Sequence, residues 1–366
     1  DRMNLMIQDT DELQPDTQWS ETAWAHSREE DLTDDHSNPR LCVAALLPFK
    51  KGQPDWGSFE RMLHWMMKCA NHFGVEMTFV LNADTGYVFN LSNELYEEVI
   101  IRFRSLYPDA SFISGVTAVG ASPTEFQASC YHSHLEIAQA HGPCEVMVMT
   151  SQALNALDPE RRRDAYFKIA EKIEVPALVH ALEPAFVPWA TPFEPWLLHQ
   201  LAGHEKFVGG KISTLDEPHF LYWASMCRDL GLDFVPHSGD DFGIASAIRM
   251  GLPLLIGAGV SACPLICAAK KYWRKDDFDS RVYKLFEAFQ SLEDLVFRLD
   301  DKGSAAGYKH STAEILQMLG VIDSAEIHPE CPDLRTGDER ARMQEALIRP
   351  LRIAERMNIP FYSFPS

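Results

Sequence analysis

The chain of 366 residues carries a formal net charge of −20, with 46% hydrophobic and 23% charged residues. Such an acidic surplus argues against nucleic acid or an anionic membrane as a partner, and the hydrophobic share is ample for a large core. The eight cysteines include no Cys-x-x-Cys pair and no zinc-ligand spacing, which favours a reducing cytoplasm.

The N-terminal forty residues differ in composition from the rest of the chain. They hold eleven acidic and three basic side chains, which predicts a solvated acidic arm over residues 1–40, with a short helix near residues 21–30. They lack the apolar stretch of a signal peptide. The uncharged run 250–269 is long enough to suggest a membrane span, but Pro253, Pro264 and three glycines divide it into strand, loop and helix. We therefore expect no membrane span.

From residue 41 onward, short apolar runs alternate with amphipathic segments. Asp55, for example, precedes a helical pattern in which Phe59, Met62 and Leu63 begin an apolar stripe. The predicted strands are 41–47, 76–81, 111–115, 145–149, 177–181, 207–211, 233–236 and 254–256. The predicted helices are 55–70, 92–106, 122–140, 159–173, 195–202, 217–230, 241–250 and one that begins near 264.

Eight strand–helix units in succession predict a TIM (β/α)8 barrel over residues 41–275. A doubly wound sheet is the alternative, but no Gly-x-Gly-x-x-Gly follows the first strand. Beyond this point the pattern is purely helical, with helices expected around 278–289, 315–319 and 341–357. We expect residues 276–366 to form a C-terminal helical domain.

Lys211 ends the sixth predicted strand. A strand alternates its faces, so Phe207, Gly209 and Lys211 share one side, and in a closed barrel that side can be the interior. Gly209 would leave room beneath the ammonium. Burial lowers the pKa of a lysine, and the neutral amine can attack a carbonyl to form a Schiff base. The alternative is a lysine that ends its strand in solvent.

Other polar groups follow the predicted strands, where a barrel of this kind carries its chemistry. The loops that contain residues 237–239 and 257–259 could bind a phosphate or the hydroxyls of a sugar-like acid. His132 and His134 suggest a metal, but two helical residues two positions apart point in roughly opposite directions. We expect a surface or packing role for that pair, and no metal.

Four short motifs in chain order give the chain a resemblance to a known family. They are Thr85-Gly86 with Leu91-Ser92, Val208-Gly209-Gly210-Lys211, Ser238-Gly239-Asp240-Asp241, and the segment 251–264 with Gly257 and Gly259. Over roughly residues 41–297 the chain resembles the dihydrodipicolinate synthase / N-acetylneuraminate lyase family of class I aldolases. The resemblance implies a TIM barrel with a C-terminal helical domain, a homo-oligomer (dimer or tetramer), and Lys211 as the lysine that binds a 2-oxo acid such as pyruvate.

The chain also departs from the family pattern at the site. Asp84 stands where the family has the first of two threonines that hold the carboxylate of the keto acid. His180 stands at the position of the proton-relaying tyrosine, and a tyrosine pair of the family falls near Ala153 and Leu154. A histidine can still move a proton, since its pKa lies near neutrality. A hydrogen-bonded core histidine is the alternative for His180.

These features predict a Schiff-base lyase, an aldolase or dehydratase, that acts on a 2-oxo acid and is not the true synthase. It needs no cofactor or metal. A non-catalytic barrel that binds a small acid is the first alternative, and a metal-dependent hydrolase built on His180, His237 and Asp240 is the second. The expected catalytic residues are Lys211 and His180, and the expected substrate-binding residues are Asp84, Thr85, Gly86, Ser238, Gly239, Asp240, Ile256 and Gly257.

Overall fold

The computed structural model describes residues 40–214, 216–231, 233–239, 241–273, 280–331 and 334–360. The predicted acidic arm, its helix and the boundary at residue 275 lie outside these ranges. The two domain boundaries therefore stay predictions.

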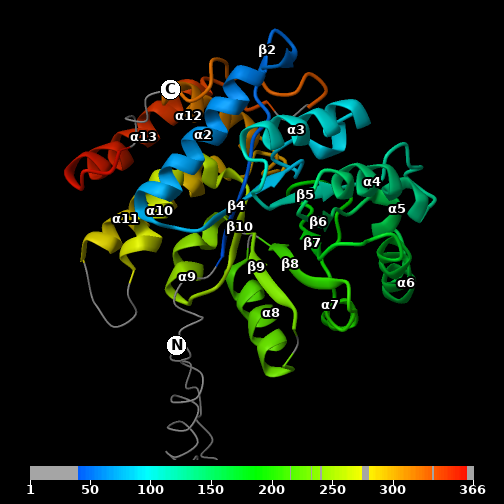
Figure 1. The fold of residues 1–366 in the computed structure, drawn as a ribbon. Coiled ribbons are helices and arrows are strands. Elements are labelled where there is room, and N and C mark those ends of the chain that lie inside the picture. The colour runs from blue at the N-terminus through cyan, green and yellow to red at the C-terminus, as the bar shows by residue number, and fades with distance from the viewer. Residues whose placement is uncertain are drawn as a thin grey trace, which may run out of the picture. The chain divides into compact units, whose positions relative to one another are not determined.

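Eight parallel strands close into a barrel in the order β1-β10-β9-β8-β7-β6-β5-β4 (Figure 1). The predicted TIM barrel is thus confirmed, and the doubly wound alternative is wrong because the sheet has no open edge. Every strand pair within the barrel is parallel. The strands are β1 (Leu41–Ala44), β4 (Met77–Leu81), β5 (Phe112–Val116), β6 (Cys144–Val148), β7 (Ala177–Leu182), β8 (Phe207–Ser213), β9 (Val235–Ser238) and β10 (Leu254–Ile256).

Helices connect these strands and surround the barrel, because each helix buries one apolar face against the sheet. They are α2 (Trp56–Phe73), α3 (Asn93–Leu106), α4 (His132–Ala140), α5 (Gln152–Asn155), α6 (Pro159–Ala170), α7 (Pro195–Ala202), α8 (Glu217–Asp229), α9 (Ile244–Arg249) and α10 (Cys263–Tyr272). Short 3-10 turns supplement them at η2 (Val88–Asn90), η3 (Ala128–Tyr131), η4 (Asp241–Gly243) and η5 (Ala258–Val260).

The first helix shows how the local sequence determines its ends. The side chain of Asp55 accepts a hydrogen bond from the Ser58 amide at 3.2 Å, as an N-cap should. Gly74 ends the helix in the left-handed conformation, with φ of +62°. The apolar stripe predicted from Phe59, Met62 and Leu63 is buried.

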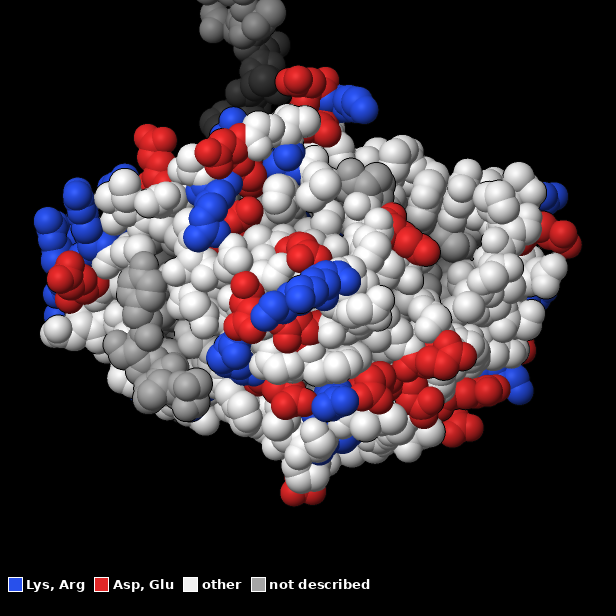
Figure 2. All heavy atoms as spheres, turned by 90° about the horizontal axis from the view of Figure 1, so that it is seen from above, with Lys and Arg blue, Asp and Glu red and all other residues white. Residues whose placement is uncertain are grey.

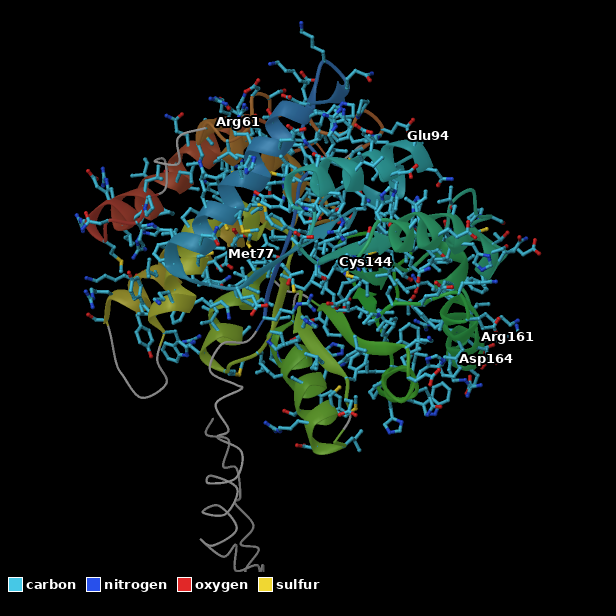
Figure 3. The ribbon with its side chains drawn as sticks, in the orientation of Figure 1. Arg61, Met77, Glu94, Cys144, Arg161 and Asp164 are labelled. Atoms are coloured by element: carbon cyan, nitrogen blue, oxygen red, sulfur yellow. The ribbon has the colours of Figure 1, made fainter. Side chains whose placement is uncertain are left out.

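Charged side chains lie on the outer faces of the helices. Figure 3 shows Glu94 on α3 and Arg161 and Asp164 on α6 at the periphery, where all three are exposed, while Cys144 on β6 is buried. Acidic and basic side chains are interspersed on the face seen in Figure 2.

Three helices follow the barrel in the chain: α11 (Ser280–Val296), α12 (Tyr308–Met318) and α13 (Glu339–Arg356). The expected helical C-terminal part is confirmed, and α11 packs against α10 and α13. The middle helix begins seven residues earlier than predicted, since the sequence was expected to be helical only over 315–319. Its extra turns place Tyr308 and Lys309 beside the barrel mouth. No helix in the described part of the chain is long and apolar enough to cross a membrane, and the run 250–269 forms β10, η5 and most of α10.

Several predicted boundaries were wrong for identifiable reasons. The helix expected from residue 122 begins at η3, because the Ser122 hydroxyl accepts hydrogen bonds from the Thr124 and Glu125 amides and caps only a local turn. The seventh strand was expected over 233–236 and instead runs to Ser238, whose amide donates to the Pro253 carbonyl. A short hairpin, β2 (Phe49–Lys50) and β3 (Gln53–Pro54), was not predicted.

A close approach between β5 and the loop after β4 fixes the position of that loop. A Cβ atom on Gly115 would lie 2.1 Å from the Asn82 carbonyl oxygen. Asn82 itself has a positive φ of 49°, and its side-chain amide donates to the Tyr96 carbonyl at 3.1 Å. The loop that carries Asp84 and Thr85 therefore rests on backbone contacts that allow no side chain at position 115.

We predict that Gly115→Ala lowers the free energy of unfolding by about 2 kcal/mol or more, because a backbone carbonyl cannot rotate away from the new methyl group. Gly203→Ala is the matched control, since a Cβ there meets its nearest atom at 3.5 Å. Urea unfolding of both variants measures the difference. Equal stability of the two variants would contradict the close approach.

Candidate active site

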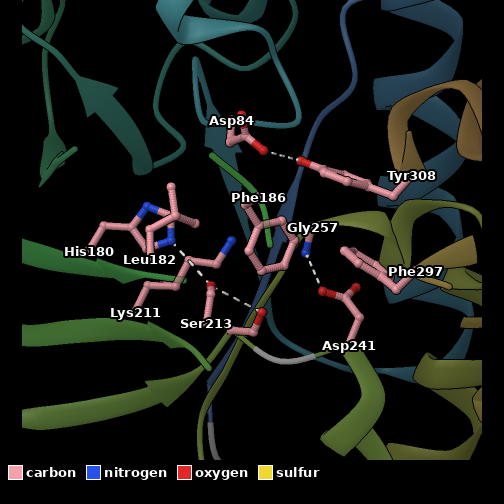
Figure 4. A pocket seen from close by; sticks show the side chains of 11 residues that line it. Asp84, His180, Leu182, Phe186, Lys211, Ser213, Asp241, Gly257, Phe297 and Tyr308 are labelled. Atoms are coloured by element: carbon pink, nitrogen blue, oxygen red, sulfur yellow. Dashed lines mark hydrogen bonds between the residues drawn. The ribbon is translucent and has the colours of Figure 1, made fainter. Parts of the chain in front are cut away.

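A cavity opens at the carboxyl ends of the strands, where TIM barrels carry their chemistry (Figure 4). Its wall combines side chains from β7 and β8, loops that follow other strands, and the C-terminal helical part. The lining residues are Asp84, His180, Leu182, Phe186, Lys211, Ser213, Gly239, Asp241, Gly257, Phe297 and Tyr308.

Lys211 lies on β8, the sixth barrel strand, and faces this cavity as predicted. Its side chain is only 5% exposed. Burial lowers the pKa of Lys211 below its ordinary value, and the nearby carboxylates of Asp241 and Asp84 oppose that shift. The amine therefore loses its proton more readily than a surface lysine does.

The glycine that makes room for Lys211 is Gly239, not Gly209 as we expected. A Cβ atom on Gly239 would lie 2.6 Å from Lys211 Cγ and 2.7 Å from its Cε. A Cβ atom on Gly209 would instead meet the Val235 carbonyl oxygen at 2.5 Å and the ring of His237 at 3.4 Å. Gly209 thus permits the close approach of β9, whereas Gly239 admits the lysine side chain.

His180 lies beside Lys211 on the neighbouring strand β7. Its Nε2 lies 3.2 Å from the Ser213 hydroxyl, which also lies within hydrogen-bond distance of the Gly239 carbonyl, and its Nδ1 lies 3.3 Å from Met149 Sδ. Burial, and then the charge of Lys211, lower the pKa of His180 well below its ordinary value. The ring is therefore a neutral imidazole with a partner at each nitrogen.

Asp84 also lines the cavity, but its charge is paired. Lys309 Nζ lies 3.1 Å from Asp84 Oδ1, and the Tyr308 hydroxyl donates to Asp84 Oδ2 at 2.7 Å. The same hydroxyl lies 3.1 Å from Thr85 Oγ1. The acidic side chain that stands where the family has a threonine is therefore paired with a lysine of the C-terminal helical part.

Asp241 fills the loop after β10 that we expected to bind a phosphate or sugar hydroxyls. Its Oδ1 accepts from the Ala258 and Gly259 amides at 3.0 and 3.1 Å, and its Oδ2 accepts from the Gly257 amide at 3.1 Å. Burial raises the pKa of Asp241 to about 6, against the opposing effects of Lys211 and these amides. An internal carboxylate thus occupies the backbone donors that an external anion would need.

A second buried acid lies behind Asp241. Glu293 on α11 is fully buried, and its Oε1 accepts from the Ser261 hydroxyl at 3.4 Å. Burial, and then the charge of Asp241, raise the pKa of Glu293 well above its ordinary value. Through Ser261, Glu293 therefore contacts the loop after β10, whose amides hold Asp241.

The other predicted binding residues differ in their relation to the cavity. Gly239 and Gly257 belong to its wall, while Asp240 lies outside the described residues. Ser238 and Ile256 end their strands, and Thr85 reaches the cavity through Tyr308. Gly86 lies in the turn that closes the loop after β4, where its amide donates to the Ala83 carbonyl. The roles given to these residues stay predictions.

The histidine pair of α4 has a packing role in part. His134 is buried and stacks on Tyr96 with 3.8 Å between ring centres, and its Nδ1 accepts from the Thr117 amide at 3.4 Å. Within the described ranges, no three His, Cys, Asp or Glu side chains gather as a metal site would require.

Sequence reasoning missed Tyr308, Lys309, Phe186 and Phe297. Tyr308 is separated from Asp84 by more than two hundred residues, and helix α12 begins without a side-chain cap that could have marked it. Asp241 was noticed only as part of the Ser-Gly-Asp-Asp motif. The only local feature that marks Tyr308 in the sequence is its place directly after Gly307.

The chain was compared with known proteins in sequence and in structure. No protein-family model matches the chain. The 4-hydroxy-tetrahydrodipicolinate synthase of Thermodesulfovibrio yellowstonii is 26% identical over 259 residues, which are 70% of this chain and 81% of that protein.

Solved structures share the fold at lower identity. The dihydrodipicolinate synthase of Bacteroides thetaiotaomicron superposes with a TM-score of 0.68 at 16% identity, over 84% of this chain and 97% of that one. The chloride-inhibited dihydrodipicolinate synthase of Acinetobacter baumannii, complexed with pyruvate, gives 0.65 at 20% identity, over 85% and 98%. The chain thus shares the fold of the dihydrodipicolinate synthases, and its sequence relation to one of them is consistent with a divergent member of that family.

Proposed function

We propose that the protein is a class I lyase, an aldolase or dehydratase, in which Lys211 forms a Schiff base with a 2-oxo acid. The observation that carries this proposal is a lysine buried at the strand ends of a TIM barrel, with a lowered pKa and a cavity before it. The relation to a 4-hydroxy-tetrahydrodipicolinate synthase supports the same reaction class.

The chemistry follows from the neutral amine. Lys211 Nζ attacks the carbonyl carbon, and the carbonyl oxygen takes up one proton from the nitrogen and one from an acid. Loss of this oxygen as water leaves an iminium. The cationic nitrogen then accepts the electron pair of the bond that breaks next to it. His180 is the candidate acid/base for these proton transfers, and Thr85 with the amides around it would orient the substrate.

The charges around the cavity favour a substrate other than that of the synthase. Two carboxylates, Asp84 and Asp241, lie close enough to influence the pKa of Lys211, and Lys309 pairs with Asp84. Ala153 and Leu154, where the family has tyrosines, are buried and apolar. We therefore propose a 2-oxo acid lyase that differs from the true synthase in its second substrate.

Further expectations complete the proposal. By the family resemblance we propose a homo-oligomer, a dimer or tetramer, in a reducing cytoplasm. We propose that the reaction proceeds without a metal or organic cofactor, since the iminium itself is the electron sink. A non-catalytic barrel that binds a small acid is the alternative, and the next experiment separates the two.

We predict that borohydride traps a covalent adduct when the protein is incubated with a panel of 2-oxo acids that includes pyruvate, sugar-derived acids and aromatic acids. Peptide mass mapping should place the added mass on Lys211, and Lys211→Ala should remove it. Lys270→Met is the matched control, because burial also lowers the pKa of Lys270, to about 8, but it lies outside the cavity. A folded protein that gives no adduct with the whole panel would favour the non-catalytic barrel.

Adduct formation should depend on pH in a defined direction. Only the neutral amine attacks, so the trapping rate rises with pH until Lys211 is deprotonated. Because the pKa of Lys211 is lowered from its ordinary 10.5, the rate should level off below that pH. Initial rates of trapping measured across the alkaline range test this. A rate that still rises through pH 10.5 would show an amine of ordinary pKa.

Asp84 and Lys309 should be energetically coupled, since both side chains are at most 10% exposed. We predict that Asp84→Asn, which keeps the acceptor for Tyr308, lowers the free energy of unfolding by about 3 kcal/mol, and that adding Lys309→Met restores part of it. Lys50→Met is the control, because the Lys50–Asp323 pair is about half exposed, where solvent screens the charges and the pair contributes little to stability. Additive losses in the double variant would contradict the coupling.

A further inference from the structure

The hydroxyl of Tyr308 bridges the two polar residues of the loop after β4. It donates to Asp84 Oδ2 at 2.7 Å (Figure 4). It also lies 3.1 Å from Thr85 Oγ1. A tyrosine hydroxyl carries a single proton, and a carboxylate can only accept. The Thr85 hydroxyl therefore donates to Tyr308, and the three side chains form a directed chain from Thr85 through Tyr308 to Asp84.

The ring of Tyr308 is held firmly. It stacks on Phe297 with 4.6 Å between ring centres and 15° between ring planes, and Lys309 Nζ lies 5.0 Å from the centre of the same ring. The side chain is 2% exposed, yet it belongs to the wall of the cavity that Lys211 faces. The hydroxyl is thus fixed at the cavity before any substrate arrives.

The other titratable groups in the described cavity wall are already engaged. Asp241 accepts three backbone amides, and His180 has a partner at each ring nitrogen. Lys211 is the proposed nucleophile. The pair of Tyr308 and Asp84 differs from these groups because it joins a donor hydroxyl to an acceptor carboxylate, whose other oxygen lies 3.1 Å from Lys309 Nζ.

We propose that Tyr308 is a catalytic residue that carries the proton between Asp84 and the substrate carbon next to the Lys211 iminium. This inference rests on the proposed Schiff-base function. In the forward step the C3–H proton moves to Tyr308 Oη while the Tyr308 proton moves to Asp84 Oδ2. The C–H electron pair becomes the C2–C3 double bond of the enamine, and the iminium π pair returns to the nitrogen. The reverse step returns the proton from Asp84 through Tyr308 to carbon.

The burial of Tyr308 is consistent with a relay and not with a free base. Burial, and then the charge of Asp84, raise the pKa of Tyr308 well above its ordinary value, so the phenol keeps its proton at neutral pH. Such a phenol gives its proton to Asp84 only while it takes up a proton from the substrate. Asp84 is then the final acceptor, which gives a use to the acid that replaces a threonine of the family.

Exchange of C3 hydrogen for deuterium tests the relay separately from iminium formation. Wild-type protein in D2O is incubated with pyruvate, 2-oxobutanoate or phenylpyruvate, and proton NMR follows the loss of the C3 signal, while borohydride trapping measures the iminium in parallel. Tyr308→Phe should slow exchange about 100-fold or more and leave the trapped adduct on Lys211. Tyr166→Phe is the matched control, since it removes a buried hydroxyl for which the described residues supply no hydrogen-bond partner.

The exchange and trapping measurements separate the relay from the Schiff-base function. If wild-type protein forms an adduct and Tyr308→Phe exchanges within a few-fold of its rate, the relay is wrong and the Schiff-base function stands. If Tyr308→Phe loses both adduct and exchange while its circular dichroism is unchanged, Tyr308 acts before the enamine and the stated role is wrong. If His180→Gln abolishes exchange and Tyr308→Phe does not, His180 is the base. If no acid gives an adduct with wild-type protein, the Schiff-base function and the relay are both wrong.

Discussion

The burial of one amine between two carboxylates is the constraint on which the site depends. Lys211 lies inside the mouth of a closed barrel, where removal from water favours the neutral amine, and Asp84 and Asp241 favour the charged one. Burial is the larger effect, so the pKa of Lys211 is lowered and its neutral form is favoured. Both carboxylates have other partners. Asp84 contacts Lys309 and Tyr308, and Asp241 accepts hydrogen bonds from three backbone amides.

The barrel and its additional helices divide this task. Strands β7 and β8 supply His180, Lys211 and Ser213, whereas α12 supplies Tyr308 and Lys309 and α11 supplies Glu293. The C-terminal helices thus do more than cover the barrel, because Lys309 pairs with Asp84 in the loop after β4 and Glu293 contacts the loop after β10 that holds Asp241. This division explains how a loop that carries an aspartate can be accommodated beside the cavity that Lys211 faces.

Much of the fold was predictable because alternating apolar and amphipathic segments have few stable arrangements. The strand that carries Lys211, its sixth position and its inward direction followed from that pattern. Tyr308 and Lys309 did not, since a contact across more than two hundred residues leaves no local signal and α12 has no side-chain cap. The hydrogen bonds from the Gly257–Gly259 amides to Asp241 could not be predicted either. The sequence does not show whether such amides bind a carboxylate of the same chain or an external anion. One helix start was predicted wrongly from a capping residue. Ser122 does accept hydrogen bonds from two following amides, but only a single turn forms there and no helix follows it directly.

A crystal structure of the protein soaked with pyruvate tests the central claim most directly. The account predicts continuous electron density from Lys211 Nζ to C2 of the ligand, with the hydrogen bond between Tyr308 and Asp84 retained beside it. Pyruvate bound in the cavity at full occupancy without a covalent link to Lys211, under conditions where the amine is neutral, would contradict the account.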